Sequence, residues 1–170
     1  MATASVCFSA KSDQIGRAGE YYVAAEILRR GGYAVTFSGN MPGTDILASD
    51  VNQTRQIGIQ VKTKGPGSTV WQTSTARARK AAGAAADAEV HGRFWVLVDL
   101  RTVHPEFYVM PEWWALNNIY EKHQDYLQSH GGVRPGNPMS THHAITKQRV
   151  EEWRERWSEL RILRLPSKDD

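Results

Sequence analysis

The chain has 170 residues, of which 41% are hydrophobic and 23% are charged, with a formal net charge of +3. This composition is typical of a globular protein with a buried core and excludes a disordered or fibrous chain. No apolar run reaches the roughly 20 residues that cross a bilayer, so we expect one domain over residues 1–170 and no membrane partner.

The cysteine count and the first residues bear on location. Cys7 is the only cysteine in the sequence, which excludes an internal disulfide and favours a reducing compartment. Residues 1–10 lack the basic flank and the long apolar run of a secretory signal. We therefore expect a loose N-terminal extension and a cytoplasmic protein.

The first predicted element is a helix from Ser12 to about Arg30, ended by the Gly31-Gly32 pair. Residues at three- and four-residue steps form one stripe along it, namely Gly16, Glu20, Val23, Ala24 and Ile27. Glu20 therefore lies on the apolar side, where a carboxylate costs free energy unless it is paired or near a metal. Glycines in this helix favour a close approach to a sheet or a substrate backbone.

Three short strands follow, at residues 33–38, 44–49 and 55–63, joined by turns that favour an antiparallel meander. In the third strand, aliphatic residues alternate with Gly58, Gln60 and Lys62. Side chains on a strand have period two, so Gln60 and Lys62 share one face, about 6–7 Å apart along it. That spacing suits a metal ligand and a cation acting on one phosphate.

Residues 51–86 contain no Asp or Glu but several cations, which predicts a positive surface for a polyanion. A solvated basic face is the commoner reading of such a run, but here the cations adjoin the polar strand residues. A helix over residues 76–89 is expected to carry three of them near its start. The predicted nucleic-acid contacts are Arg55, Lys64, Arg77, Arg79 and Lys80, with Trp71 as a candidate for stacking on a base.

An apolar run at residues 94–100 predicts a central strand covered on both faces, and residues 107–110 predict another. A helix is expected from Pro111 to about Ser129, then a loop over residues 131–146. A last helix from about Lys147 would place tryptophans on one core stripe. Residues 111–170 are thus expected to form a C-terminal helical extension to a core at residues 12–110.

The order helix, three-strand meander, helix and strand resembles the PD-(D/E)XK nuclease superfamily, which has the restriction-endonuclease-like fold. The resemblance covers roughly residues 12–110 and is carried by three short motifs: Glu20 in Gly-Arg-Ala-Gly-Glu, Asp45 in Pro-Gly-Thr-Asp-Ile-Leu, and Gln60-Val-Lys62. It implies an α/β fold with a mixed central sheet flanked by helices (α-β-β-β-α-β). It also implies a Mg²⁺- or Mn²⁺-dependent endonuclease acting on nucleic acid, most simply DNA.

The resemblance assigns roles to particular residues. The catalytic set would be Glu20, Asp45, Gln60 and Lys62, with the metal on Asp45, Gln60 and the Val61 carbonyl, assisted by Glu20. Gln60 stands where the superfamily usually has Asp or Glu, although type IV restriction enzymes of the same superfamily commonly carry Gln-x-Lys. An amide oxygen ligates Mg²⁺ as a dipole and not as a full charge, so metal affinity should be lower.

Three other readings remain open. The first is a protein of the same fold that binds nucleic acid without cleaving it. The second is a nuclease built from His123, His130, His142 and His143, although no metal-ligand spacing supports it. The third is a protein-interaction or immunity module whose C-terminal tryptophans form an interface, with Trp113-Trp114 at a partner surface or in a homodimer.

Overall fold

The computed structural model describes residues 10–39, 41–80 and 92–163. A five-stranded sheet contains β1 (Tyr33–Thr36), β2 (Ile46–Ser49), β3 (Gln56–Lys64), β5 (Arg93–Asp99) and β6 (Glu106–Pro111), and a second sheet pairs β4 (Val70–Ser74) with β7 (His142–Thr146). The helices are α1 (Ser12–Arg29), α3 (Glu112–Ser129) and the short α4 (Lys147–Val150), with single 3-10 turns η1 (Thr75–Arg77), η2 (Glu151–Trp153) and η3 (Trp157–Leu160).

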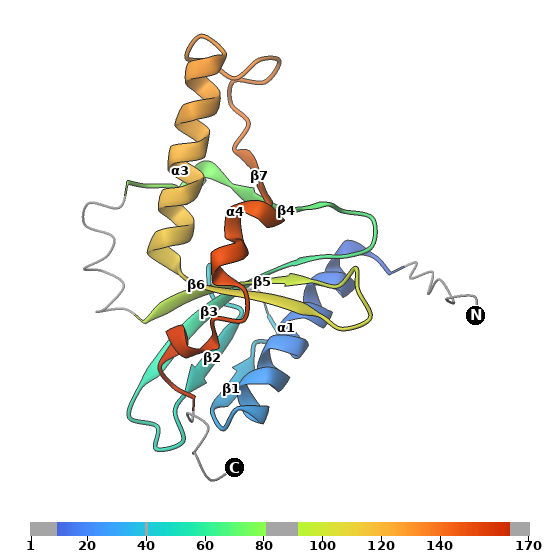
Figure 1. Cartoon of the computed structure of the whole chain (residues 1–170), viewed down its shortest axis with the longest axis vertical. Helices are drawn as coiled ribbons and strands as arrows, with labels where there is room; N and C mark the ends of the chain where they lie inside the picture. The colour runs from blue at the N-terminus through green and yellow to red at the C-terminus, as the bar shows by residue number, and fades with distance from the viewer. Residues whose placement is uncertain (1–9, 40, 81–91, 164–170) are drawn as a thin grey trace.

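The main sheet is mixed, with the strand order β1-β2-β3-β5-β6. The first three strands form the predicted antiparallel meander, β5 runs parallel to β3, and β6 returns antiparallel to β5. A parallel pair needs a long connection, and the chain between β3 and β5 supplies it. This confirms the α/β prediction of a mixed central sheet flanked by helices (Figure 1).

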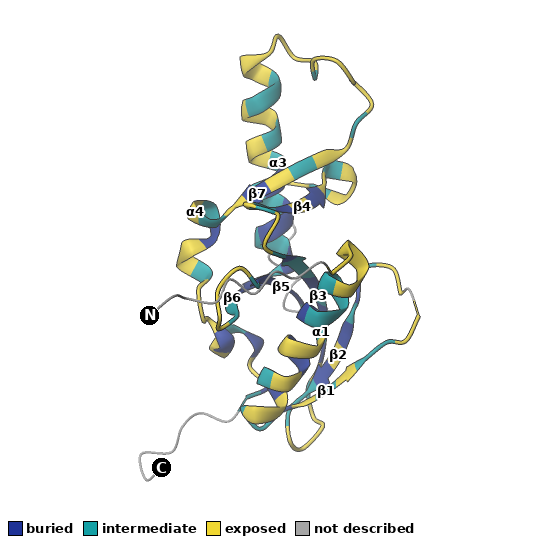
Figure 2. Ribbon diagram, turned by 90° about the vertical axis from the view of Figure 1, so that its right-hand side faces the viewer, coloured by how far each residue is buried: buried dark blue, intermediate teal, exposed yellow. Residues whose placement is uncertain are grey.

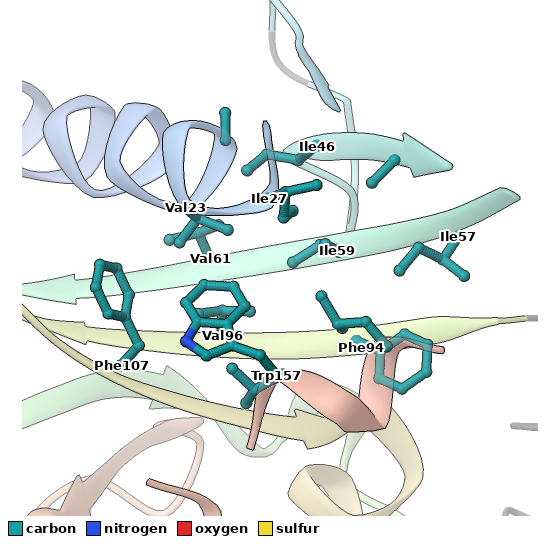
Figure 3. Packing of buried hydrophobic residues seen from close by; sticks show 14 of the residues in the cluster. Val23, Ile27, Ile46, Ile57, Ile59, Val61, Phe94, Val96, Phe107 and Trp157 are labelled. Carbon is teal, nitrogen blue, oxygen red and sulfur yellow. The ribbon is translucent and has the colours of Figure 1, made fainter. Parts of the chain in front are cut away.

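The alternation predicted for β3 is present. Ile57, Ile59 and Val61 are buried on the face that α1 covers, together with Val23 and Ile27 from that helix (Figure 3). Trp157 of η3 packs against the same cluster. Burial of these aliphatic side chains on one face fixes the register, because a slip by one residue would turn Gln60 and Lys62 into the core.

Close packing of α1 on β3 depends on one glycine. A Cβ at Gly19 would collide with the side chain of Thr63, whereas a Cβ at Gly16 would meet nothing within 4 Å. The expectation of a close approach is therefore confirmed for Gly19 and wrong for Gly16. After α1, Gly31 takes a φ of +85°, the left-handed conformation expected for a helix stop.

The opposite face of the sheet carries a second apolar cluster built from Trp95, Leu97, Leu116 and Ile119, with Trp71 from β4. Helix α3 begins after Pro111 as predicted and extends away from the main sheet, with β4 and β7 beside it (Figure 1). Figure 2 shows that the distal part of α3 is largely exposed. No helix in the described ranges is both long and apolar enough to cross a bilayer.

Two local predictions were wrong. The loop expected over residues 131–146 contains β7, which pairs with β4 across more than 60 residues of chain. The expected last helix breaks after Val150 because the chain then runs along β6, where the Glu155 N–H donates to the Phe107 carbonyl at 2.9 Å. The C-terminal segment is therefore not purely helical.

The helix expected over residues 76–89 starts differently. Thr75–Arg77 form a single 3-10 turn, capped by the Ser74 hydroxyl, which accepts a 3.1 Å hydrogen bond from the Ala76 N–H. Residues 78–80 have no regular structure, and residues 81–91 lie outside the described residues.

Candidate active site

The site lies where β2 and β3 separate. Their ladder ends at the pair Ile46–Ile59, and β3 continues alone on that side to Lys64. Asp45 stands at the end of the ladder: its N–H donates to the Ile59 carbonyl at 2.8 Å. Its Oδ2 accepts a 2.7 Å hydrogen bond from the Val61 N–H. The carboxylate thus satisfies a strand-edge donor that has lost its strand partner.

The ladder geometry also orients the neighbouring groups of β3. The N–H and C=O of one residue point to the same side in an antiparallel ladder, so the Val61 carbonyl faces the gap that Asp45 occupies. Gln60 and Lys62 are half-buried on their common face. Their side chains make no hydrogen bond or ion pair with any described residue, so both are available to a ligand.

Glu20 reaches this gap from α1. Its side chain is 18% exposed and forms a 2.5 Å ion pair with Arg17. The same guanidinium donates a 2.7 Å hydrogen bond to the Phe37 carbonyl, so it bridges the helix and the chain after β1. An open pocket of about 230 Å³ lies between these elements, lined by Arg17, Glu20, Phe37, Ser38, Gly39 and Asp45. The sequence interpretation missed Arg17, although its position three residues before Glu20 on a helix predicts contact.

The charges in the gap affect one another. Burial raises the pKa of Glu20 above its ordinary value of 4.5, Arg17 opposes that rise, and the negative charge of Asp45 adds to it. Lys62 lowers the same pKa. Glu20 is thus within electrostatic range of both Asp45 and Lys62, and it lines the pocket together with Asp45, whereas Gln60 and Lys62 are not among the lining residues.

The donor set fits a hard divalent cation. Asp45 and Glu20 offer carboxylate oxygens, and Gln60 and Val61 offer an amide and a backbone carbonyl, which are the oxygen ligands that Mg²⁺ and Mn²⁺ accept. Among the described residues, no group of three His, Cys, Asp or Glu side chains is arranged to hold a metal. Any ion held here would therefore depend on the neutral oxygens of β3 and on ligand phosphate or water.

Two predicted nucleic-acid contacts are wrong because their side chains are interior. Lys64 is 2% exposed, and its ammonium lies 3.0 Å from Asp99 and 3.6 Å from the centre of the Trp71 ring. Trp71 is fully buried, and its indole N–H donates to the Val98 carbonyl at 2.8 Å. Neither side chain can reach a phosphate or stack on a base.

The other predicted contacts differ in position. Arg77 is half-exposed and pairs at 2.9 Å with Glu112, a buried carboxylate that also holds Arg93 at 2.9 Å. Arg79 and Lys80 are exposed. Arg55 precedes β3 at its far end, five residues from Gln60, or about 16 Å along the strand. Arg55 is therefore not part of the site.

The structure disfavours the histidine reading. His142 and His143 lie on opposite faces of β7, and His143 Nε2 lies 3.0 Å from an Arg149 nitrogen. Burial and the nearby positive charge of Arg149 lower the pKa of His143 to about 4. Of the C-terminal tryptophans of the interaction reading, Trp157 is buried and Trp114 packs edge-on against Trp153 at 5.2 Å, while Trp113 and Trp114 are half-buried.

No protein-family model and no curated protein matches the sequence. Solved structures do match in shape. The Holliday junction resolvase Hjc of Archaeoglobus fulgidus is 14% identical with a TM-score of 0.50, over 89% of this chain and 98% of that one. A bacterial homing endonuclease is 13% identical with a TM-score of 0.47, over 88% of this chain and 91% of that one. At this identity the likeness to the resolvase concerns the fold alone, a mixed central sheet flanked by helices.

Proposed function

We propose that this protein is a divalent-metal-dependent endonuclease that hydrolyses phosphodiester bonds, with DNA as its substrate. The observation that carries the proposal is the gap between β2 and β3. There, the Asp45 carboxylate accepts a hydrogen bond from the N–H of Val61, the residue between Gln60 and Lys62 on β3. Glu20 and Lys62 are electrostatically coupled to the same place.

The metal site would consist of Asp45, Gln60 and the Val61 carbonyl, with Glu20 beside them. A bound Mg²⁺ or Mn²⁺ would supply charge to stabilise the attacked phosphate and would lower the pKa of a bound water. Asp45 contributes a carboxylate whose orientation is held by the Val61 N–H. Preorganisation of this kind spares the site a rearrangement when ligand binds.

Lys62 is assigned the second chemical task. Its ammonium shares a face with Gln60 and has no acidic partner among the described residues that would neutralise it. A cation there can hold a phosphate oxygen, orient the attacking water or stabilise the charge that develops on the phosphate. Glu20 lowers the net positive charge around Lys62, and Arg17 keeps the Glu20 carboxylate ionised and fixed.

Gln60 favours one alternative, a protein of the same fold that binds nucleic acid without turnover. Replacement of the usual carboxylate by an amide removes a full negative charge from the metal site, so metal affinity falls. We expect cleavage to need millimolar Mg²⁺ and to be stronger with Mn²⁺. Cytoplasmic location and a homodimer are further proposals, and light scattering of the purified chain would test the second.

Nicking of supercoiled plasmid tests the proposal. We expect nicking with Mg²⁺ or Mn²⁺, none with EDTA, and none from Lys62→Ala or Asp45→Asn. Metal-dependent cleavage that survives both substitutions would refute the assigned site. DNA binding by the wild type without cleavage in either metal would favour the non-catalytic alternative.

A further inference from the structure

Two distant segments of the chain contain no Asp or Glu, namely residues 65–80 and 131–149. The fold brings them together, because β4 in the first pairs along its whole length with β7 in the second. Their Lys and Arg residues are Arg77, Arg79, Lys80, Arg134, Lys147 and Arg149. These two segments contribute only cations to the surface that they form, although Glu112 and Glu106 from neighbouring elements lie against it. An excess of cations attracts a polyanion.

Internal contacts do not cancel this charge. Arg134 donates to the Ser140 carbonyl and hydroxyl at 2.9 Å and to the His142 carbonyl at 2.7 Å, all neutral acceptors. Arg149 likewise donates to Asn118 and to the Ala144 carbonyl. Both guanidinium groups are thus held in place with their positive charge intact.

The acids that do pair with these segments are shared between two cations each. Glu112 binds both Arg77 and Arg93, and Glu106 binds both Lys147 and Arg154. The Glu112 triad retains one net positive charge, whereas Arg154 also pairs with Glu151 at 3.5 Å, so the group around Glu106 is neutral. The positive potential therefore persists although several of the side chains are paired.

The β4–β7 pair turns one face outward. Trp71 and Ile145 are buried in the cluster beneath α3, so the alternate residues lie on the opposite face (Figure 2). The exposed members of that outer face are Gln72, Ser74, His142, Ala144 and Thr146. This face is small, polar and uncharged, bordered by cations.

The pair also adjoins the candidate active site. Arg77, directly after β4, lies so close to Gly43 that a Cβ there would be 2.7 Å from its guanidinium. Gly43 is two residues before Asp45, and Arg93 donates to its carbonyl at 2.6 Å. One continuous ligand can therefore contact the gap between β2 and β3 and the outer face of β4–β7.

We propose that the outer face of the β4–β7 pair is a docking surface for duplex nucleic acid, a proposal that rests on the nuclease function above. Hydroxyl, amide and imidazole side chains beside arginines are the usual partners of phosphate and sugar in such complexes. A two-stranded antiparallel ribbon also fits the major groove of a duplex. Single-strand binders rely on exposed aromatic platforms, and the aromatic ring of β4, Trp71, is buried.

The test measures binding with cleavage suppressed. The full-length wild type and Gln72→Glu/His142→Glu are titrated in EDTA against a labelled duplex of about 30 base pairs and against one of its strands. The matched control is Gln53→Glu/Gln56→Glu, which makes the same change of charge at exposed residues of the far β2–β3 turn. Circular dichroism and thermal melting verify that all three proteins are folded.

We expect the β4–β7 variant to bind the duplex at least about tenfold more weakly than the wild type at 0.1 M salt, and the salt dependence of its binding to be reduced by about one to two counterions. The affinity of the control variant should stay within about twofold of the wild-type affinity. Equal binding by the two variants, loss confined to the single strand, or no duplex binding by the wild type would each overturn the proposal.

Plasmid nicking is scored separately. A weakened β4–β7 variant of a protein that never cleaves would support this surface and refute the nuclease. Normal cleavage and normal duplex binding by that variant would support the nuclease and refute this surface.

Discussion

The carboxylate of Asp45 accepts a 2.7 Å hydrogen bond from the N–H of Val61, the residue between Gln60 and Lys62 on β3. This contact ties the start of β2 to the strand that carries the other candidate groups. Asp45 thereby has a structural partner and a second carboxylate oxygen for a ligand.

Asp45→Asn and Asp45→Ala should separate these two functions. The amide of Asn retains an acceptor for the Val61 N–H, so the free energy of unfolding should change by less than about 1 kcal/mol while nicking falls roughly a hundredfold or more. Alanine also leaves the donor unpaired and should cost about 1 kcal/mol further. Urea unfolding and nicking rates measure both, and nicking by the Asn variant at the wild-type rate would contradict the metal-ligand role.

Lys62 and Lys64 share a face of β3, but replacement by Met should reduce cleavage only at Lys62. Lys62→Met removes a half-buried ammonium, so stability should change by less than about 1 kcal/mol, whereas cleavage should fall at least about a hundredfold. Lys64→Met alters a buried ion pair but no group of the site. Cleavage by its folded fraction should stay near the wild-type rate, and an equal loss in both variants would contradict the division of roles.

The stabilising contribution of Asp99 should be lost at acid pH. Burial alone would raise its pKa, but hydrogen bonds from Arg101 and Lys64 outweigh burial and lower it from 3.8 to about 2. A lowered folded-state pKa stabilises the protein above pH 3.8, and this contribution is lost as the pH falls towards about 2.

Asp99→Ala leaves the buried Lys64 ammonium unpaired and should cost about 3–5 kcal/mol. Circular dichroism followed from pH 6 to pH 2 should show that the variant lacks the wild-type loss of stability in the acid window. Identical acid profiles would show that Asp99 is not the titrating group.

Glu20 should support activity at a cost in stability at neutral pH. Burial raises its pKa above 4.5, so the folded protein protonates it more readily than the unfolded chain does, and its contribution to stability becomes less favourable as the pH rises through that window. Glu20→Gln should therefore be at least as stable as the wild type at neutral pH but less active. Cleavage by the wild type should decline on acidification from above pH 4.5, and a Gln variant with an unchanged pH profile would contradict this.

The two glycines of α1 provide a matched pair for testing the packing. Gly19→Ala places a Cβ against Thr63 of β3 and should destabilise the protein by about 1–3 kcal/mol. Gly16→Ala meets open space and should stabilise it by about 0.5–1 kcal/mol through helix propensity. Thermal unfolding of the two variants compares them directly, and a stabilised Gly19→Ala protein would mean that α1 does not lie against β3 as described.

Local patterns determined much of the architecture. The alternation of Ile57, Ile59 and Val61 specified both the strand and its buried face, because side-chain period and burial are properties of a few neighbouring residues. The turns around Gly43 and Asp50 likewise set the antiparallel meander. Periodicity predicted that Gln60 and Lys62 share a face, whereas the candidate set of Glu20, Asp45, Gln60 and Lys62 was named from the resemblance of three short motifs to the PD-(D/E)XK superfamily.

Only the tertiary structure decided which polar groups are free and which are buried. Lys62 and Lys64 look alike in the sequence, but β4 crosses the end of β3 and places Trp71 over Lys64, while its partner Asp99 comes from β5. The pairing of β4 with β7 could not be predicted from the sequence either, because strands distant in the chain carry no local signal of their partner. Charge and periodicity are properties of neighbouring residues in the sequence, whereas burial and strand pairing depend on which distant segments of the chain pack against a residue.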